Sequence, residues 1–342
     1  MKKYLTHMAA FLLTLNLNAC GPSDGGYILS PEEGDDNTDI PTTPPTEETV
    51  EGHLTISHTI RDVVNHEAFS GFGRFILPLE RRPDQDMTLS RIPSLLPYHN
   101  YVDARRAVDI INAMVDSVHT GRQLFYDIYS EEEKRTNADK ANTGIFFFRG
   151  RPGSPFAIFC PGGGFSYVGS IHEGFPLAME LSRKGYNAFV IQYRIGGAQV
   201  ACEDLAKAVD FIHRHAAELQ VGTRDYSLWG GSAGARMAAY VGSYAPGGFI
   251  NSDCPRPATV VMGYTGHSEY TPYDPPTYVV IGENDGIASP AVMRRRVEAL
   301  QSLGIDAEFH LFPDLQHGFG LGTGTTAEGW MDGAVRFWEE HL

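Results

Sequence analysis

The stretch Leu-Trp-Gly-Gly-Ser-Ala-Gly-Ala-Arg at positions 228–236 joins an apolar run to a helical pattern through Gly230-x-Ser232-x-Gly234. A strand that turns sharply into a helix presents its central serine at the tip of the turn. The flanking glycines supply the backbone freedom and the space that such a turn needs. The chain has 37 glycines in 342 residues, so the pattern alone also fits an ordinary glycine-rich turn. Its meaning depends on the segments around it.

Strand-like and helix-like segments alternate from residue 122 onward. Short apolar runs, typical of strands buried on both faces, are separated by amphipathic stretches with helical spacing. This alternation predicts parallel βαβ units, and therefore an α/β fold whose mostly parallel central sheet has helices on both faces. The predicted strands are 124–129, 145–148, 156–160, 188–193, 226–229, 259–262, 277–281 and 307–312, and the predicted helices are 172–183, 200–219, 233–244, 290–303 and 326–342.

The first twenty residues resemble a secretory signal. They begin Met-Lys-Lys, continue with a short apolar region and end Leu-Asn-Ala-Cys at Cys20. The apolar region is too short to span a membrane as a helix. A cysteine at this position resembles a bacterial lipobox, which predicts acylation of Cys20 and a lipid-anchored protein exported to the cell envelope. The alternative is an ordinary signal peptide with an incidental cysteine.

Residues 21–52 are acidic and lack periodicity. They contain nine acidic residues and no Lys or Arg, a composition that predicts a disordered tether. The formal charge of −15 divides into +2 for residues 1–20, −9 for this tether and −8 for residues 53–342. The folded part is therefore only modestly acidic, which argues against a nucleic-acid partner.

Residues 53–121 are expected to form an N-terminal extension packed on the α/β domain of residues 122–342. An amphipathic helix is predicted over 108–118, with apolar side chains at helical spacing. The aromatic, glycine-rich stretch 69–78 fits either a structural edge or part of a substrate mouth. The three cysteines after Cys20 suggest buried thiols. A bridge between Cys202 and Cys254 is not expected, because they fall at opposite ends of the predicted strands.

Four chemically notable elements follow predicted strands, and ligands bind at that edge of a parallel sheet. They are Ser232, the glycine run 162–164, Asp285 and His317. A serine hydroxyl becomes a good nucleophile when a neutral imidazole takes its proton, and His317 lies in the loop after the last strand.

An imidazole in this role needs a carboxylate to fix its tautomer, and Asp285 follows an apolar strand directly. Glu283 is a near rival for this role and Asp314 a more distant one.

The glycine run 162–164 can bring backbone N–H groups close to a developing oxyanion. The N–H of Ala233, next to Ser232, would be a further donor. A phosphate-binding loop is the alternative reading of the glycines. No Lys follows with Walker spacing and the dinucleotide pattern G-x-G-x-x-G is missing, so this alternative is not favoured.

The order glycine-rich loop, G-x-S-x-G, Asp and His resembles the α/β-hydrolase superfamily. Within it, residues 122–342 are similar to the acetyl esterase/lipase group related to hormone-sensitive lipase and to carbohydrate esterases. The resemblance rests also on Pro161-Gly-Gly-Gly-Phe165, with Pro where many members have His, and on the pairs Tyr193-Arg194 and Glu203-Asp204. It implies a triad of Ser232, Asp285 and His317, with no metal or cofactor. The implied oxyanion donors are Gly163, Gly164 and Ala233, with Gly162 as the alternative if the loop register differs by one.

Two departures from the group refine the expectation. The helix after the nucleophile begins Ala-Gly-Ala-Arg, where relatives often have Gly-His or Gly-Gly. The stretch 245–276, where relatives often insert a cap, is short and rich in Pro and Gly, so a minimal cap and short acyl groups are expected.

The function expected from the resemblance is a serine carboxylic-ester hydrolase for acetyl or other short-chain esters, including those of polysaccharides. A serine peptidase of the prolyl-oligopeptidase type is one alternative, although too few residues precede 122 for its propeller. A non-catalytic binding module and a true lipase are the others.

Overall fold

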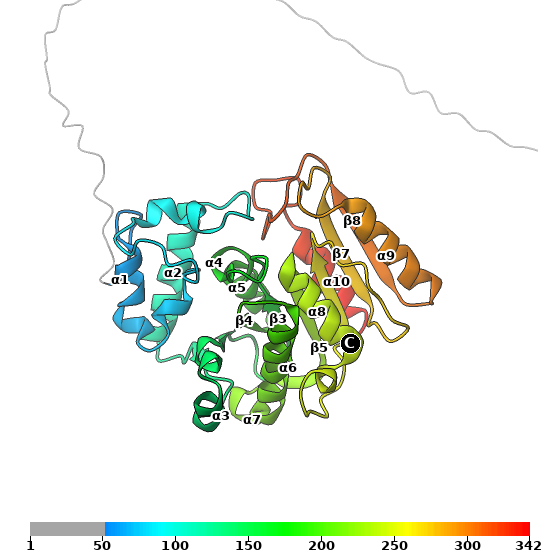
Figure 1. The fold of residues 1–342 in the computed structure, drawn as a ribbon, viewed down its shortest axis with the longest axis horizontal. Helices are drawn as coiled ribbons and strands as arrows, with labels where there is room; N and C mark the ends of the chain where they lie inside the picture. The colour runs from blue at the N-terminus through cyan, green and yellow to red at the C-terminus, as the bar shows by residue number, and fades with distance from the viewer. Residues whose placement is uncertain (1–51) are drawn as a thin grey trace, which may run out of the picture. The chain divides into compact units, whose positions relative to one another are not determined.

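An eight-stranded sheet organises residues 52–342, the part of the chain that this computed structural model describes (Figure 1). The predicted signal, most of the tether and Cys20 lie outside the described residues. The strand order is β1-β2-β4-β3-β5-β6-β7-β8; β2 pairs antiparallel with both β1 and β4, and the other neighbours are parallel. The strands are β1 (Phe125–Tyr126), β2 (Gly144–Phe148), β3 (Pro155–Cys160), β4 (Asn187–Gln192), β5 (Gly222–Gly231), β6 (Thr259–Gly263), β7 (Thr277–Gly282) and β8 (Ala307–Phe312).

The central strands are apolar along their whole length because helices cover both faces of the sheet. Every residue of β4, β6 and β7 is buried. Within the sheet, Phe147 of β2 stacks on Phe189 of β4 with ring centroids 4.2 Å apart. Strands buried on both faces are expected of a parallel sheet between two helical layers. The predicted α/β class is confirmed.

The helical layers lie on opposite sides of the sheet. On one side, Lys184 and Tyr186, which follow α5, pair with Asp332 and Glu339 of α10. On the other side α6 and α8 pack against each other, and Figure 1 shows them in front of the strands with α10 behind. No helix within residues 52–342 is long and apolar enough to cross a bilayer. The helices named here are α5 (Phe175–Arg183), α6 (Ala198–Arg214), α8 (Ala233–Tyr244), α9 (Pro290–Ser302), which packs on β7 and β8, and α10 (Trp330–Glu339).

Some predicted elements are shorter than expected. The helix predicted over 200–219 is interrupted at His215, whose backbone leaves the helical region, and continues as α7 (Ala216–Leu219). The helix predicted over 172–183 is also divided, because α4 (Ser170–Glu173) ends at Gly174 before α5 begins. The predicted strand 124–129 reduces to β1, which pairs only with β2 at the edge of the sheet.

The N-terminal extension packs on the α/β domain through helices and aromatic rings. It contains α1 (Ile60–Val64) and α2 (Ala104–His119), which starts where the side chain of Asp103 accepts the N–H of Arg106. Phe72 and Phe75 both stack on Phe125 of β1, with centroids 5.3 and 5.4 Å apart. The aromatic stretch 69–78 therefore forms a structural edge.

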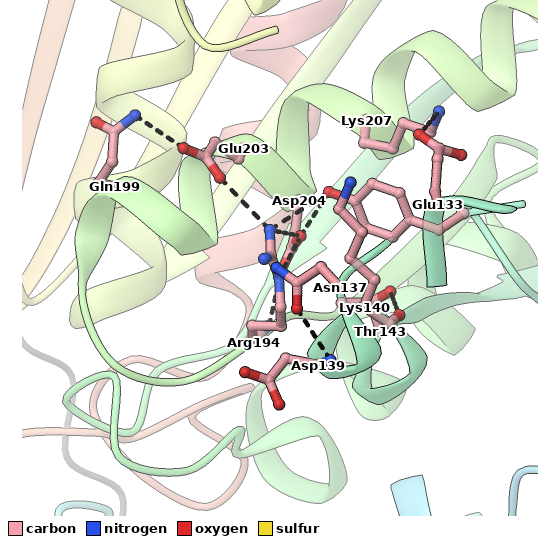
Figure 2. A network of polar contacts seen from close by, with 11 residues as sticks. Glu133, Asn137, Asp139, Lys140, Thr143, Arg194, Gln199, Glu203, Asp204 and Lys207 are labelled. Atoms are coloured by element: carbon pink, nitrogen blue, oxygen red, sulfur yellow. Dashed lines mark hydrogen bonds and ion pairs between the residues drawn. The ribbon is translucent and has the colours of Figure 1, made fainter. Parts of the chain in front are cut away.

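A buried polar network joins the end of β4 to α6 and explains two of the residue pairs on which the resemblance rests (Figure 2). The Arg194 side chain donates to the Asp204 carboxylate at 2.7 and 3.0 Å, and the Tyr129 hydroxyl donates to it at 2.7 Å. Asp204 is fully buried, and burial raises the pKa of its carboxyl even beside Arg194. Removing one member of such a buried pair costs about 3–5 kcal/mol. These residues therefore stabilise the junction between the end of β4 and α6.

The three described cysteines are free. Cys160 and Cys202 are buried, and burial raises the pKa of the Cys202 thiol to about 12. Cys254 is partly exposed. The buried thiols of Cys160 and Cys202 act as small apolar side chains.

Candidate active site

Ser232 occupies a strained turn between β5 and α8. Its backbone angles are φ 53° and ψ −115°, a region that residues with a side chain rarely adopt. Its N–H donates to the carbonyl of Gly263 at 2.9 Å, which ties the turn to the end of β6. The serine also sits at the N-terminus of α8, where the helix dipole favours negative charge. The surrounding packing holds the turn in this strained conformation. The turn presents the serine at the edge of the sheet.

The glycines around Ser232 are required by space. A Cβ on Gly230 would lie 2.3 Å from the backbone of Gly234, and a Cβ on Gly234 would lie 1.8 Å from the carbonyl oxygen of Cys160. Neither glycine has a positive φ. The unusual backbone conformation of the turn is therefore adopted by Ser232 and not, as predicted, by the glycines. The two glycines are needed because they leave the space in which β3, β5 and α8 approach closely.

His317 links Ser232 to Asp285. Its Nε2 atom lies 3.0 Å from the Oγ atom of Ser232, and its Nδ1 atom lies 2.8 and 3.0 Å from the two oxygens of Asp285. An Nδ1–H donated to the carboxylate leaves Nε2 free to accept the serine proton. Tyr264 packs edge-on against the imidazole, with ring centroids 5.2 Å apart. The structure thus brings the three predicted residues together.

Asp285 is the carboxylate that reaches His317. Its side chain is fully buried, and the N–H groups of Ile287 and Ala288 donate to Oδ1 at 2.8 and 2.7 Å. The two rivals, Glu283 and Asp314, are exposed and make no contact with the imidazole. Three hydrogen-bond donors therefore stabilise the buried charge of Asp285.

The predicted oxyanion donors lie on both sides of Ser232. Gly163 has φ +135°, and a Cβ there would lie 2.1 Å from the carbonyl oxygen of Tyr167; Gly164 has φ +62°. Within residues 52–342, the N–H groups of Gly163, Gly164 and Ala233 have no protein acceptor. Donors left unsatisfied at such a site are what an oxyanion needs.

Gly162 does not serve as the alternative donor. Its N–H donates to Oε2 of Glu173 at 2.6 Å, so it points away from an incoming carbonyl. The register with Gly163 and Gly164 as donors is therefore the one that the geometry favours.

Several residues beside the site were not predicted. Glu173 and His99 form a buried ion pair behind the glycine loop, with Glu173 Oε1 3.1 Å from His99 Nε2. Asn100 donates to the carbonyl oxygen of His317 through Nδ2 at 2.7 Å. Tyr98 lies beside Gly164. The sequence signal for Glu173 was its charge near the start of the predicted helix 172–183. His99 and Asn100 lie in a stretch without periodicity.

Within residues 52–342, no three His, Cys, Asp or Glu side chains are arranged to hold a metal ion.

The comparison with protein families matches residues 149–259 to the BD-FAE family. This match covers β3, β4 and β5, including the glycine loop and Ser232, and it ends before Asp285. An acetylxylan esterase from Xylanibacter ruminicola is 20% identical over 210 residues. The alignment covers 52% of this chain and 44% of that relative, so the chain spans less than half the length of the relative.

Solved structures with a similar fold include an acetyl ester-xyloside bifunctional hydrolase from Caldicellulosiruptor lactoaceticus, with TM-score 0.56 and 21% identity over 64% of this chain and 96% of that one. The carboxylesterase Cest-2923 from Lactobacillus plantarum has TM-score 0.51 and 22% identity over 58% and 92%. An esterase from Thermogutta terrifontis with bound propionate has TM-score 0.52 and 18% identity over 58% and 89%. At these identities the likeness establishes the fold.

Proposed function

We propose that this chain, an α/β hydrolase, is a serine carboxylic-ester hydrolase that forms an acyl-enzyme on Ser232. The observation that carries the proposal is the unbroken contact from Ser232 Oγ through His317 to Asp285, with distances of 3.0 and 2.8 Å. The unsatisfied N–H groups of Gly163, Gly164 and Ala233 lie beside it. This combination provides a nucleophile, a base and an oxyanion site in one place.

In the first half of the reaction, His317 Nε2 takes the proton of Ser232 Oγ as the oxygen attacks the ester carbonyl. The carbonyl oxygen becomes an oxyanion and accepts the N–H groups of the glycine loop and of Ala233. His317 then gives its proton to the leaving alcohol oxygen as the carbon–oxygen bond of the ester breaks. The acyl group stays on Ser232.

In the second half, water replaces the alcohol. His317 takes a proton from the water, the hydroxide adds to the acyl carbon, and the carboxylic acid leaves as the proton returns to Ser232. Asp285 remains ionised throughout. Its bond to Nδ1 keeps the imidazole in the required tautomer and stabilises the imidazolium that forms in each half.

The substrate we propose is an acetyl or other short-chain ester of a polysaccharide. The relative from Xylanibacter ruminicola is named an acetylxylan esterase and the structure from Caldicellulosiruptor lactoaceticus an acetyl ester-xyloside hydrolase, which supports this class. The connection from β6 to β7, residues 264–276, contains no helix in the described chain, so no helical cap covers the site from there. The lack of a helical cap on that side suits a bulky leaving alcohol.

Two exposed aromatic rings also support a sugar as the leaving group. Tyr98 is 44% exposed and lies over Gly164, where a Cβ would be 3.1 Å from the ring. It stacks on the buried Tyr167, with centroids 5.8 Å apart and planes 17° apart. Tyr101 is 42% exposed and its hydroxyl accepts the N–H of Gln316, next to His317. Flat rings with polar edges suit the apolar faces of sugar rings.

The N-terminus leads us to propose export and lipid anchoring through Cys20, as its sequence suggests. Metabolic labelling with a palmitate analogue tests this part: wild-type protein should be labelled, and Cys20→Ser should not. Labelling of the Cys20→Ser variant would contradict lipid anchoring through Cys20 and would have no bearing on the esterase proposal.

Two measurements test the esterase proposal itself. Acetate release from acetylated xylan is expected, and turnover of p-nitrophenyl esters should fall steadily as the acyl chain grows from acetyl to octanoyl. A preference for long chains would favour a lipase. Cleavage of a proline-containing peptide without ester turnover would favour the peptidase alternative.

A further inference from the structure

A buried carboxylate lies directly behind the proposed oxyanion site. Glu173, at the end of α4, is 3% exposed, and its Oε2 accepts the N–H of Gly162 at 2.6 Å. A Cβ on Gly231, the residue before the nucleophile, would lie 2.6 Å from the same oxygen. A Cβ on Gly162 would lie 2.7 Å from Oε2 and 3.0 Å from the Cβ of Ser232. The carboxylate thus touches both segments that frame the reacting carbonyl.

The N-terminal extension supplies the partner of this carboxylate. His99 Nε2 lies 3.1 Å from Glu173 Oε1, and both side chains are 1% exposed. His99 Nδ1 lies 2.8 Å from the hydroxyl of Tyr167, which also accepts the N–H of Tyr98 at 3.1 Å. His99 therefore contacts the Tyr167 hydroxyl through Nδ1 and lies against the Glu173 carboxylate through Nε2.

The electrostatics of the pair are those of a carboxylate kept ionised inside the protein. Burial by itself raises the pKa of the Glu173 carboxyl, but the charge and hydrogen bond of His99, with the Gly162 N–H, lower it to about 2. His172, which meets His99 edge-on, stays neutral because burial, and then the charge of His99, lower its pKa to about 4. The cluster therefore keeps the Glu173 carboxylate available as a buried acceptor for the Gly162 N–H.

The same segment holds the loop of His317. Asn100 donates to the carbonyl oxygen of His317 through its N–H at 3.3 Å and through Nδ2 at 2.7 Å. Residues 98–100 thus contact the glycine loop through Glu173 and the histidine loop directly. Both loops lie in the α/β domain, far along the chain from residues 98–100.

We propose that Glu173, held by His99, is a positioning residue that aims the N–H groups of Gly163 and Gly164 at the oxyanion. This inference rests on the proposed function. Because the bond to Glu173 turns the Gly162 N–H inward, it orients the following peptide planes toward the substrate. His99 has a second effect: when it is protonated, its charge, 3.1 Å from Oε1, offsets a carboxylate that would otherwise oppose negative charge developing on the carbonyl oxygen. The N-terminal extension thereby becomes part of the active site.

Four variants separate a positioning role from a merely structural one. Glu173→Ala removes the acceptor of the Gly162 N–H and should lower kcat on p-nitrophenyl acetate on the order of 10²-fold or more, with little change in KM. Glu173→Gln keeps an acceptor oxygen and should stay within about 10-fold of wild type. His99→Gln leaves the carboxylate uncompensated and should also lose on the order of 10²-fold. The double variant His99→Gln/Glu173→Gln should regain most of that loss.

The rate at which a fluorophosphonate labels Ser232, followed by mass spectrometry, is measured in parallel. Labelling needs the nucleophile and the oxyanion site but no ester turnover. The labelling rates of the variants should therefore rank in the same order as their kcat values. Wild-type protein that labels at Ser232 without hydrolysing esters would contradict the proposed function, and the order of labelling rates would still decide the positioning role. Wild-type protein that does not label would overturn both.

Asp274→Asn is the matched control. Asp274 forms another buried ion pair, with Arg296, and accepts from Ser243 near the far end of α8. By the length of that helix it lies roughly 15 Å from Ser232. This variant should lower the melting temperature and leave kcat and the labelling rate unchanged.

Three results would overturn the positioning role. They are wild-type kcat in Glu173→Ala, equal losses in the Ala and Gln variants at 173, and independent, additive losses from His99→Gln and Glu173→Gln. If Glu173→Ala does not fold, the two single variants His99→Gln and Glu173→Gln and their double variant are sufficient for the test. Recovery of kcat in the double variant is predicted only by the proposed charge balance.

Discussion

His317 Nε2 lies 3.0 Å from Ser232 Oγ, although 85 positions separate the two residues in the chain. The contact exists because β5 and β8 are parallel strands of one sheet, so the loops after them open at the same edge. Asp285 reaches the other side of the imidazole from the end of β7, which lies between those strands. The site is therefore a product of sheet topology, and its parts can be tested one at a time.

The carboxylate beside the imidazole is the first part to test. Asp285→Asn should reduce kcat on p-nitrophenyl acetate on the order of 10⁴-fold, because an amide can hold the ring in the wrong tautomer. Asp314→Asn is the matched control at an exposed aspartate of the histidine loop and should keep wild-type kcat. Steady-state kinetics of both variants decide the matter; a large loss in Asp314→Asn with none in Asp285→Asn would reverse the assignment.

The glycine loop should not tolerate a side chain at Gly163. Gly163→Ala places a Cβ 2.1 Å from the Tyr167 carbonyl oxygen at φ +135°, so the loop must move. We expect kcat to fall on the order of 10²–10³-fold, as when one oxyanion donor is lost. Gly324→Ala is the control for backbone strain, since Gly324 has φ +74° and open space around its Cβ position. Comparable losses in both variants would show that the effect is general destabilisation.

Acid should destabilise the fold through His172. Its pKa is lowered from 6.5 to about 4 in the folded protein, first by burial and then by the charge of His99. Between those pH values the unfolded chain binds a proton that the folded protein does not, so the free energy of unfolding falls as pH drops from 6.5 to about 4. The loss from this residue is about 3 kcal/mol in total.

Urea unfolding at a series of pH values measures this loss. His172→Gln, whose amide can still donate to the Gly318 carbonyl, should show a shallower decline over that range. Part of the decline in the free energy of unfolding should remain in this variant, because burial and the charge of Arg296 lower the pKa of His267 to about 3. Glu173 acts at lower pH: its stabilisation is present above pH 4.5 and is lost as pH falls toward 2. An unchanged slope in His172→Gln would contradict the assignment.

The exposed ring of Tyr98 should matter for sugar esters more than for small ones. Tyr98→Ala removes a flat surface beside Gly164, so we expect kcat/KM on acetylated xylan to fall about 10-fold, the equivalent of roughly 1.4 kcal/mol. Turnover of p-nitrophenyl acetate should change little. Tyr273→Ala, at a ring that is 67% exposed near the remote Asp274, is the control and should leave both substrates unaffected. Equal losses on both substrates would argue against a sugar contact.

The fold, the nucleophile and the base could be predicted because Ser232 and His317 lie in loops that follow apolar strands. The periodicity of residues 122–342 identifies the strands, and the strand ends converge whatever the loop details. The choice of Asp285 over Glu283 could not be made in that way, because it depends on which carboxyl is buried and aimed at His317.

The surroundings of the oxyanion site could not be predicted for a different reason. Whether Gly162 is a free donor depends on Glu173, whose carboxylate reaches it across a turn. His99 and Asn100 act from a segment without regular secondary structure, and their contacts are long-range. Local periodicity carries no information about such contacts. The same holds for the break of the predicted helix 200–219 at His215.

The most direct test of the central claim is the turnover of p-nitrophenyl acetate by Ser232→Ala, compared with wild type under the same conditions. If Ser232 forms the acyl-enzyme with His317 as its base, kcat should fall on the order of 10⁶-fold while the melting temperature is maintained, since alanine keeps the Cβ and only the hydroxyl group is removed. A folded Ser232→Ala protein that keeps turnover within about 10-fold of wild type would contradict the claim, because that loss is far below what removal of a nucleophile costs.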